Sequence, residues 1–93
     1  MDFARVLNES GLTKIDLATV YGVSRQTIHA WTFIAPPRAN SLLARQAETI
    51  TQALLLAIDR GVLPLEATDR ATRQERINTI AAKLQGLKPA AAK

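Results

Sequence analysis

Apolar residues recur along the chain at intervals of three and four, which is the spacing of one helix face, and no segment alternates as a strand does. The apolar stretches are bounded by serine or threonine where helices commonly begin and by glycine where they commonly end. The pattern predicts an all-α fold, a small bundle of five helices. These helices are expected at about residues 3–9, 13–22, 24–32, 38–60 and 68–85.

The fourth and fifth predicted helices carry the longest apolar faces. Gly61 and Gly86 follow them where a helix is expected to end, and Gly61 is expected in the left-handed conformation of a C-terminal glycine. The buried face of the fourth helix is expected to consist of Leu43, Ala47, Ile50, Leu54 and Ile58. The buried face of the fifth is expected to consist of Ile77, Ile80, Ala81 and Leu84.

Further leucines lie off these two faces and offer more apolar surface than one neighbouring helix would cover. A chain of 93 residues buries only about 60–65% of the surface that it exposes when unfolded, so association of two copies would add stability. The surplus surface therefore has two interpretations, a seam between two copies or a cover over the last helix. The residues expected at a dimer interface are Leu42, Leu55, Leu56 and Leu63.

Composition argues against several classes of function. The absence of cysteine excludes disulfides and thiolate metal sites, and a single histidine excludes a pair of histidine ligands. The sequence contains no glycine-rich phosphate loop and no catalytic constellation. We therefore expect no enzyme, no catalytic residue, no metal, no cofactor and no small-molecule ligand.

The apolar content of 47% is not gathered into a membrane-spanning segment. The most apolar run, Ala53–Ile58, is far shorter than the roughly 20 residues that a spanning helix needs. The first ten residues include Asp2 and lack the apolar core of a signal peptide. The expected location is the cytoplasm of a bacterial cell or of a phage-infected host, in association with the nucleoid.

Residues 14–31, KIDLATVYGVSRQTIHAW, combine the features that two short helices need to pack at a steep angle across a tight turn. Ala18 is small enough to let the second helix approach, and Gly22 tolerates the positive φ of the turn. Val23 and Ile28 are expected to fill the angle between the two helices. The apolar seam is expected to continue through Leu17, Trp31 and Tyr21, whose hydroxyl should lie at the rim.

The string YGVSRQTIHAW, with Ala18 before it, resembles the helix-turn-helix of the Cro and phage-repressor-like (lambda-repressor-like) family of DNA-binding proteins. With the helices before and after it, the resemblance covers roughly residues 2–58. It implies a compact helical bundle that binds double-stranded DNA as a regulator, commonly as a dimer. The expected division is a helix-turn-helix DNA-binding domain at 1–60, a C-terminal helical extension available for dimerisation at 61–86, and a disordered tail at 87–93.

The polar residues of the second helix in this unit are suited to contacting base pairs. No carboxylate lies between Asp16 and Glu48, which favours a helix that faces phosphates on both sides. Arg25 can donate two hydrogen bonds to guanine, Gln26 can pair with adenine in the same manner, and His29 lies with them on the polar side. The residues expected to contact phosphates are Thr13, Lys14, Ser24, Thr27, Thr32 and Arg38.

The net charge of +4 favours an anionic partner but does not identify one. Residues 1–40 hold four basic and three acidic groups, a net charge of +1, whereas residues 41–93 hold eight basic and five acidic groups, a net charge of +3. The arginines of the last helix, at positions 70, 73 and 76, are expected to form a solvated face paired with Asp69 and Glu75. Contact of this face with flanking DNA is the alternative.

The sequence therefore predicts a sequence-specific DNA-binding transcriptional regulator, a repressor of phage or plasmid type that acts as a homodimer on an inverted-repeat operator. Two other functions are open to the same fold. One is a DNA-recognition component of an oligomeric assembly, such as a small packaging subunit. The other is a protein-binding adaptor.

Overall fold

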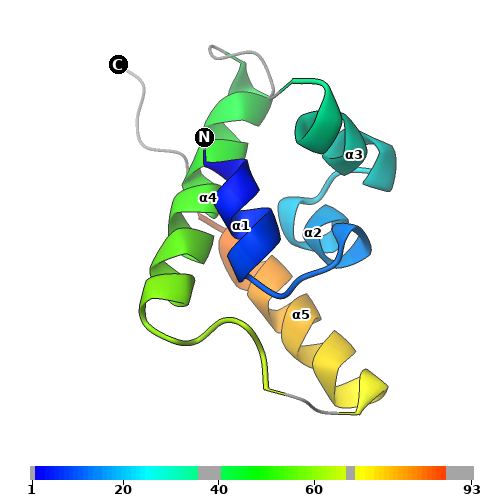
Figure 1. Cartoon of the computed structure of the whole chain (residues 1–93), viewed down its shortest axis with the longest axis vertical. Helices are drawn as coiled ribbons and strands as arrows, with labels where there is room; N and C mark the ends of the chain where they lie inside the picture. The colour runs from blue at the N-terminus through cyan, green and yellow to red at the C-terminus, as the bar shows by residue number, and fades with distance from the viewer. Residues whose placement is uncertain (1, 36–40, 67–68, 88–93) are drawn as a thin grey trace.

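The computed structural model describes residues 2–35, 41–66 and 69–87 of the 93-residue chain. Within these residues the regular structure consists of five α-helices without a strand, which confirms the predicted all-α class. The helices are α1 (Phe3–Glu9), α2 (Lys14–Tyr21), α3 (Arg25–Phe33), α4 (Leu42–Asp59) and α5 (Arg70–Gln85), as Figure 1 shows. The radius of gyration is 12.8 Å, close to the ~12 Å expected of a compact chain of this length.

Side-chain caps set the starts of the helices. Thr13 and Asp16 form a capping box: the Thr13 hydroxyl accepts a hydrogen bond from the Asp16 backbone N–H (3.2 Å), and the Asp16 carboxylate accepts one from the Thr13 N–H (3.0 Å). Ser41 and Asp69 cap α4 and α5, so these helices begin a few residues later than predicted. After α4, Gly61 has the predicted positive φ, 76°.

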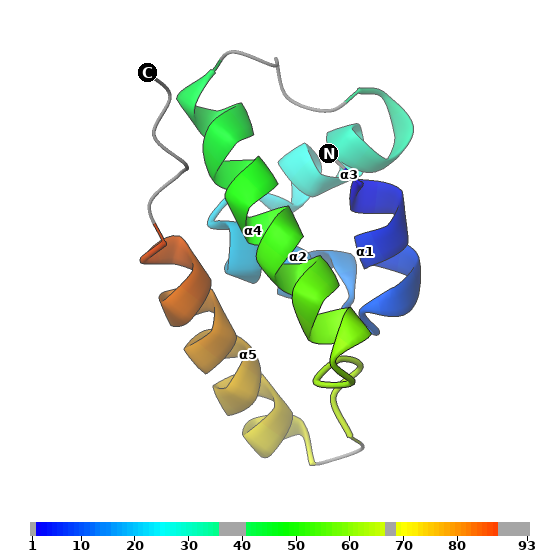
Figure 2. The ribbon, with the colours of Figure 1, turned by 90° about the vertical axis from the view of Figure 1, so that its left-hand side faces the viewer.

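The hydrophobic core draws on all five helices. The completely buried apolar side chains in the described residues are those of Val6, Leu17, Val20, Ile28, Ile50 and Ile77. Helices α4 and α5 run antiparallel side by side (Figure 2), and α5 also packs against α2. The expected division at residue 60 marks no break in this core, because Leu63 and Ala81 belong to the same buried cluster as the residues before it.

The face that α4 buries differs from the predicted one at its first turn. Ala47, Ile50 and Leu54 are buried as predicted, but Leu43 is 45% exposed and Ala44 is buried in its place. The first turn of α4 extends beyond the end of α5 (Figure 2). A residue there can have the spacing of the buried face and still have no neighbouring helix that covers it.

The four leucines assigned to a dimer interface differ in burial. Leu63 is 3% exposed and belongs to the core cluster, so its side chain covers the core and offers no surface to a second copy, which corrects its assignment. Leu55 is half-buried and packs against the same cluster. Leu42 and Leu56 are exposed on α4. Part of the surplus apolar surface therefore packs against the core of its own chain. The interface between two copies stays a prediction.

Three aromatic rings from three helices form a cluster with edge-to-face geometry. The ring centroids of Phe3, Tyr21 and Trp31 lie 5.5–5.8 Å apart. Trp31 packs against the core as predicted, although it is only half-buried. The prediction that the Tyr21 hydroxyl lies at the rim is wrong. This hydroxyl is 2.6 Å from that of Thr51 on α4, and both side chains are buried.

The buried Tyr21 hydroxyl should make the fold less stable at high pH. Burial raises the pKa of Tyr21 from 10.0 to about 12. The folded chain holds this proton more tightly than the unfolded chain, so the stabilisation is complete below pH 10 and is lost as the pH rises toward 12. Ionisation of Tyr21 should therefore lower the free energy of unfolding by about 2–3 kcal/mol over this pH range.

Tyr21→Phe is the matched variant, because it removes the ionisable group and keeps the ring. It should cost about 1 kcal/mol near neutral pH, since the Thr51 hydroxyl loses its partner, and should lose less stability at high pH. Urea unfolding at each pH measures both effects. Absorbance of the tyrosinate form titrates Tyr21 directly, because the chain has one tyrosine. Equal alkaline losses in the two proteins would contradict the expectation.

Candidate nucleic-acid interface

The connection between α2 and α3 consists of the three residues 22–24. Gly22 has the predicted left-handed conformation, with φ of 69°, and its N–H donates hydrogen bonds to the Ala18 and Thr19 carbonyls of α2. The Val23 N–H donates to the Ala18 carbonyl (3.0 Å), and the Val23 side chain packs against the core. Ser24 then caps α3, since its hydroxyl accepts a hydrogen bond from the Thr27 N–H (3.1 Å). Because each of the three turn residues makes a hydrogen bond, the turn fixes the direction of α3 relative to α2.

The exposed face of α3 carries the three residues predicted to contact bases. Arg25, Gln26 and His29 are exposed, and helical geometry places them within about 100° of the helix circumference. Ile28, on the inner side, is completely buried. Phe33 lies on the same outer face and is 65% exposed although it is aromatic. No role was predicted for Phe33, because the sequence predicts that this helix ends at residue 32, whereas α3 includes Phe33.

Four of the residues predicted to contact phosphates lie at the starts of two helices. Thr13 caps α2, and Lys14 is its first residue. Ser24 caps α3, and Thr27 lies in its first turn. The first backbone N–H groups of a helix have no intrahelical partner, and the helix dipole favours anions there. The Ser24 and Thr27 hydroxyls lie 2.9 Å apart and remain on the exposed side of the helix start. Both helix starts are therefore able to receive a phosphate oxygen.

The other two predicted phosphate contacts differ in what surrounds them. The Thr32 hydroxyl donates to the Ile28 carbonyl within α3 (2.9 Å) and is half-buried, so it is less available than the hydroxyls at the helix starts. Arg38 lies outside the described residues. The Lys14 ammonium lies 4.4 Å from the centroid of the Phe33 ring, which places the start of α2 beside the end of α3.

The one carboxylate of α2 and α3, that of Asp16, is withdrawn from this surface. Asp16 is 5% exposed, and its carboxylate accepts a hydrogen bond from the Arg73 guanidinium of α5 (2.8 Å) besides closing the capping box. Burial raises the pKa of Asp16, but the hydrogen bonds from Arg73 and Thr13 outweigh burial and hold the pKa below its ordinary value of 3.8. The charges that α2 and α3 present to solvent are those of Lys14 and Arg25.

The partner of Arg73 corrects the prediction for the last helix. The sequence predicts that Arg73 pairs with Asp69 or Glu75 on its own helix, whereas it binds Asp16, 57 residues away in the chain. Asp69 instead caps α5 by accepting hydrogen bonds from the Thr72 N–H and hydroxyl, each at 2.9 Å. Because α5 packs along α2, a carboxylate from another helix lies within reach of the guanidinium.

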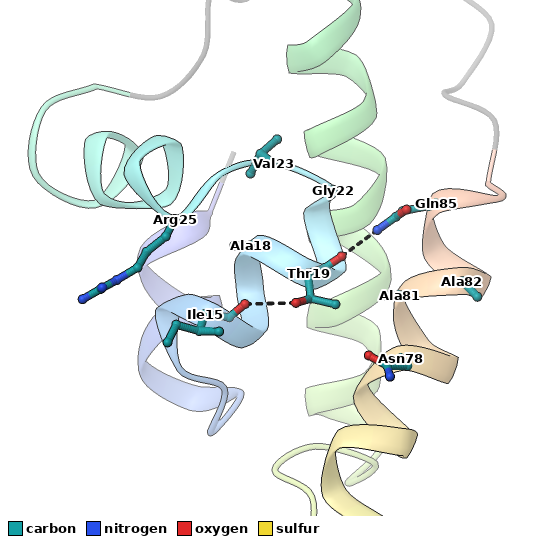
Figure 3. Close-up of a pocket in the computed structure, with 10 residues that line it drawn as sticks. All are labelled: Ile15, Ala18, Thr19, Gly22, Val23, Arg25, Asn78, Ala81, Ala82 and Gln85. Carbon is teal, nitrogen blue, oxygen red and sulfur yellow. Dashed lines mark hydrogen bonds between the residues drawn. The ribbon is translucent and has the colours of Figure 1, made fainter. Parts of the chain in front are cut away.

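A second contact holds the other end of α2 to α5. The Gln85 side-chain amide donates to the Thr19 carbonyl (2.6 Å) and to the Val20 carbonyl (3.2 Å), both in the last turn of α2. The two helices line an open groove of about 580 Å³ beside this contact (Figure 3). Arg25 lies at the edge of the groove, and its side chain points away from α5 (Figure 3), so α5 leaves the exposed face of α3 uncovered.

Two other features, a metal site and a membrane-spanning helix, are absent from the described part of the chain. It contains no group of three or more histidine, aspartate or glutamate side chains that could hold a metal ion. No helix within it combines the length and the apolar character needed to cross a bilayer.

Comparison with known proteins adds no family to this description. No family model matches the chain, and neither a curated protein nor a solved structure is significantly similar to it. The candidate site therefore rests on the residues of this chain and their geometry.

The Asp16–Arg73 ion pair should stabilise the fold near neutral pH and lose its effect in acid. Because the folded-state pKa of Asp16 is lowered, its ionised form stabilises the fold above the ordinary pKa of 3.8, and this contribution is lost as the pH falls through the folded value. Arg73→Met leaves a buried carboxylate with fewer hydrogen-bond donors. We expect this variant to lose about 1–3 kcal/mol of stability near neutral pH.

Arg76→Met is the matched control, because Arg76 is exposed on the same helix and its replacement should change stability by less than about 0.5 kcal/mol. Urea unfolding near neutral pH and at a pH well below 3.8 measures the difference between the two variants, which should shrink in acid. Equal stability of the two variants near neutral pH would show that the ion pair contributes nothing to the fold.

Proposed function

We propose that this chain is a sequence-specific transcriptional regulator that binds double-stranded DNA, a repressor of phage or plasmid type. In this proposal α2, the turn and α3 form a helix-turn-helix, and α3 lies in the major groove. The observation that carries the proposal is the exposed face of α3, where Arg25, Gln26 and His29 lie together on a helix that contains no carboxylate. The resemblance of residues 18–31 to the Cro and phage-repressor-like family agrees with it.

The side chains on this face match the groups that base pairs present in the major groove. The groove is about 12 Å wide and admits an α-helix. Arg25 can donate two hydrogen bonds to guanine O6 and N7, and Gln26 can bond adenine N6 and N7. His29 follows Arg25 by one helical turn and faces the adjacent part of the same groove. These three residues are assigned to base contacts.

Phosphate contacts are assigned to the starts of α2 and α3. Thr13 and Ser24 stand where free backbone N–H groups can also donate to a phosphate oxygen. Lys14 adds a positive charge, and the Thr27 hydroxyl lies beside that of Ser24. Such contacts orient the protein on the duplex and carry no sequence information of their own.

Two copies of the chain would explain recognition of an inverted repeat, because a symmetric dimer presents two identical helices to two half-sites. The two copies of α3 would lie about 34 Å apart, one turn of DNA. Leu42 and Leu56, exposed on α4, and the half-buried Leu55 are the interface residues in this proposal. The protein would act at the nucleoid, in the cytoplasm of a bacterial cell or of a phage-infected host.

Selection of bound sequences from a random pool of duplex DNA tests the proposal, and it should yield an inverted repeat. Against the selected site, Arg25→Ala and Gln26→Ala should each weaken binding by about 5- to 150-fold, equivalent to 1–3 kcal/mol, because each removes a bidentate base contact. Both side chains are exposed, so thermal unfolding should be unchanged. Binding should also weaken steeply as salt is raised, since phosphate contacts release counterions.

Lys83→Ala and Gln74→Ala are the matched controls, because both residues are exposed on α5, which lies apart from α3 (Figure 1). They should bind the selected site as the parent protein does. Unchanged affinity in both α3 variants would refute the base contacts. A ring instead of a dimer in light scattering would favour an assembly component, and failure to bind any DNA would favour a protein-binding adaptor.

A further inference from the structure

Phe33, the last residue of α3, turns its ring toward solvent, outside the aromatic cluster of α1, α2 and α3. Two polar groups hold the ring. The Lys14 ammonium from the start of α2 lies over it, and the His29 ring lies 4.7 Å away between centroids, at an interplanar angle of 54°. A cation over an aromatic face is attracted by the ring quadrupole. The exposed ring is therefore oriented by contacts from two helices.

The ring shares the outer face of α3 with Arg25. The two residues are separated by eight positions, which corresponds to about 12 Å along the helix axis, so the ring and the guanidinium can reach different base pairs. The Lys14 cation lies over the ring, and the Asp16 carboxylate is turned inward to Arg73. A phenyl ring beside a positive charge is suited to a DNA group that is itself apolar but is flanked by negatively charged phosphates.

We propose that Phe33 contacts the 5-methyl group of a thymine in the major groove and thereby determines specificity at a base pair other than the one that Arg25 contacts. This inference rests on the proposed function. The thymine methyl is the apolar group that base pairs present in the major groove, and phenylalanine is among the side chains that contact it. Lys14, held over the ring, points a positive charge toward the same part of the duplex.

Replacement of thymine by deoxyuridine tests this contact, because it removes the methyl group and keeps every hydrogen-bonding group of the base. Thymines in the selected site are replaced one position at a time, and binding of the full chain is measured by fluorescence anisotropy. At one position per half-site, the replacement should weaken binding of the parent protein by about fourfold, the effect expected for burial of one methyl-sized group.

Phe33→Ala should bind the thymine site more weakly than the parent and should bind the thymine and deoxyuridine duplexes equally at that position. Its salt dependence should match that of the parent, because no charge is lost. Ile34→Ala is the matched control: Ile34 is also exposed, but it follows α3 and lies off the face of Arg25. This control should keep the fourfold preference for thymine.

The outcomes separate this inference from the proposed function. If the parent protein selects a DNA site but no deoxyuridine replacement weakens binding, the methyl contact is wrong and the proposed function stands. The same holds if one replacement weakens the parent and Phe33→Ala equally, or if Phe33→Ala dissociates an oligomer in light scattering. If no DNA is selected, the proposed function fails and the thymine contact fails with it.

Discussion

The carboxylate of Asp16 joins three features on which the candidate site depends. It closes the capping box with Thr13 at the start of α2, and it binds Arg73 of α5. Because it is also the one carboxylate of α2 and α3, its burial leaves cations on their surface. At the other end of α2, Gln85 of α5 donates to backbone carbonyls. With α2 held at both ends, the turn at Gly22 decides where α3 points.

Helix α3 is held on one side and free on the other. Its inner side is fixed by the buried Ile28 and by Trp31, which packs against the rings of α1 and α2. The buried hydrogen bond between Tyr21 and Thr51 ties the end of α2 to α4. Every helix therefore contributes to positioning α3, and the outer face, from Arg25 to Phe33, is left exposed. A rigid helix with an exposed polar face is well suited to recognition by shape and hydrogen bonding.

The parts predicted correctly from the sequence depend on residues close together in the chain. Capping by Thr13, positive φ at Gly22 and burial of Ile28 each follow from a spacing of a few residues. The errors concern contacts between distant segments. Leu43 lacks the neighbour that its spacing implies, and Leu63, although assigned to a dimer seam, is buried in the core of its own chain. The resemblance pointed to the outer face of α3 but offered no reason to include Phe33.

The sequence by itself determined the five helices, most of their boundaries and the polar outer face of α3, because hydrophobic periodicity and capping act over one or two turns. Only the tertiary structure decided which groups meet across helices. The contacts of Tyr21 with Thr51, of Asp16 with Arg73 and of Gln85 with the end of α2 join residues 30, 57 and 65–66 positions apart. No local pattern specifies such pairs, because they form only when packing brings the helices together.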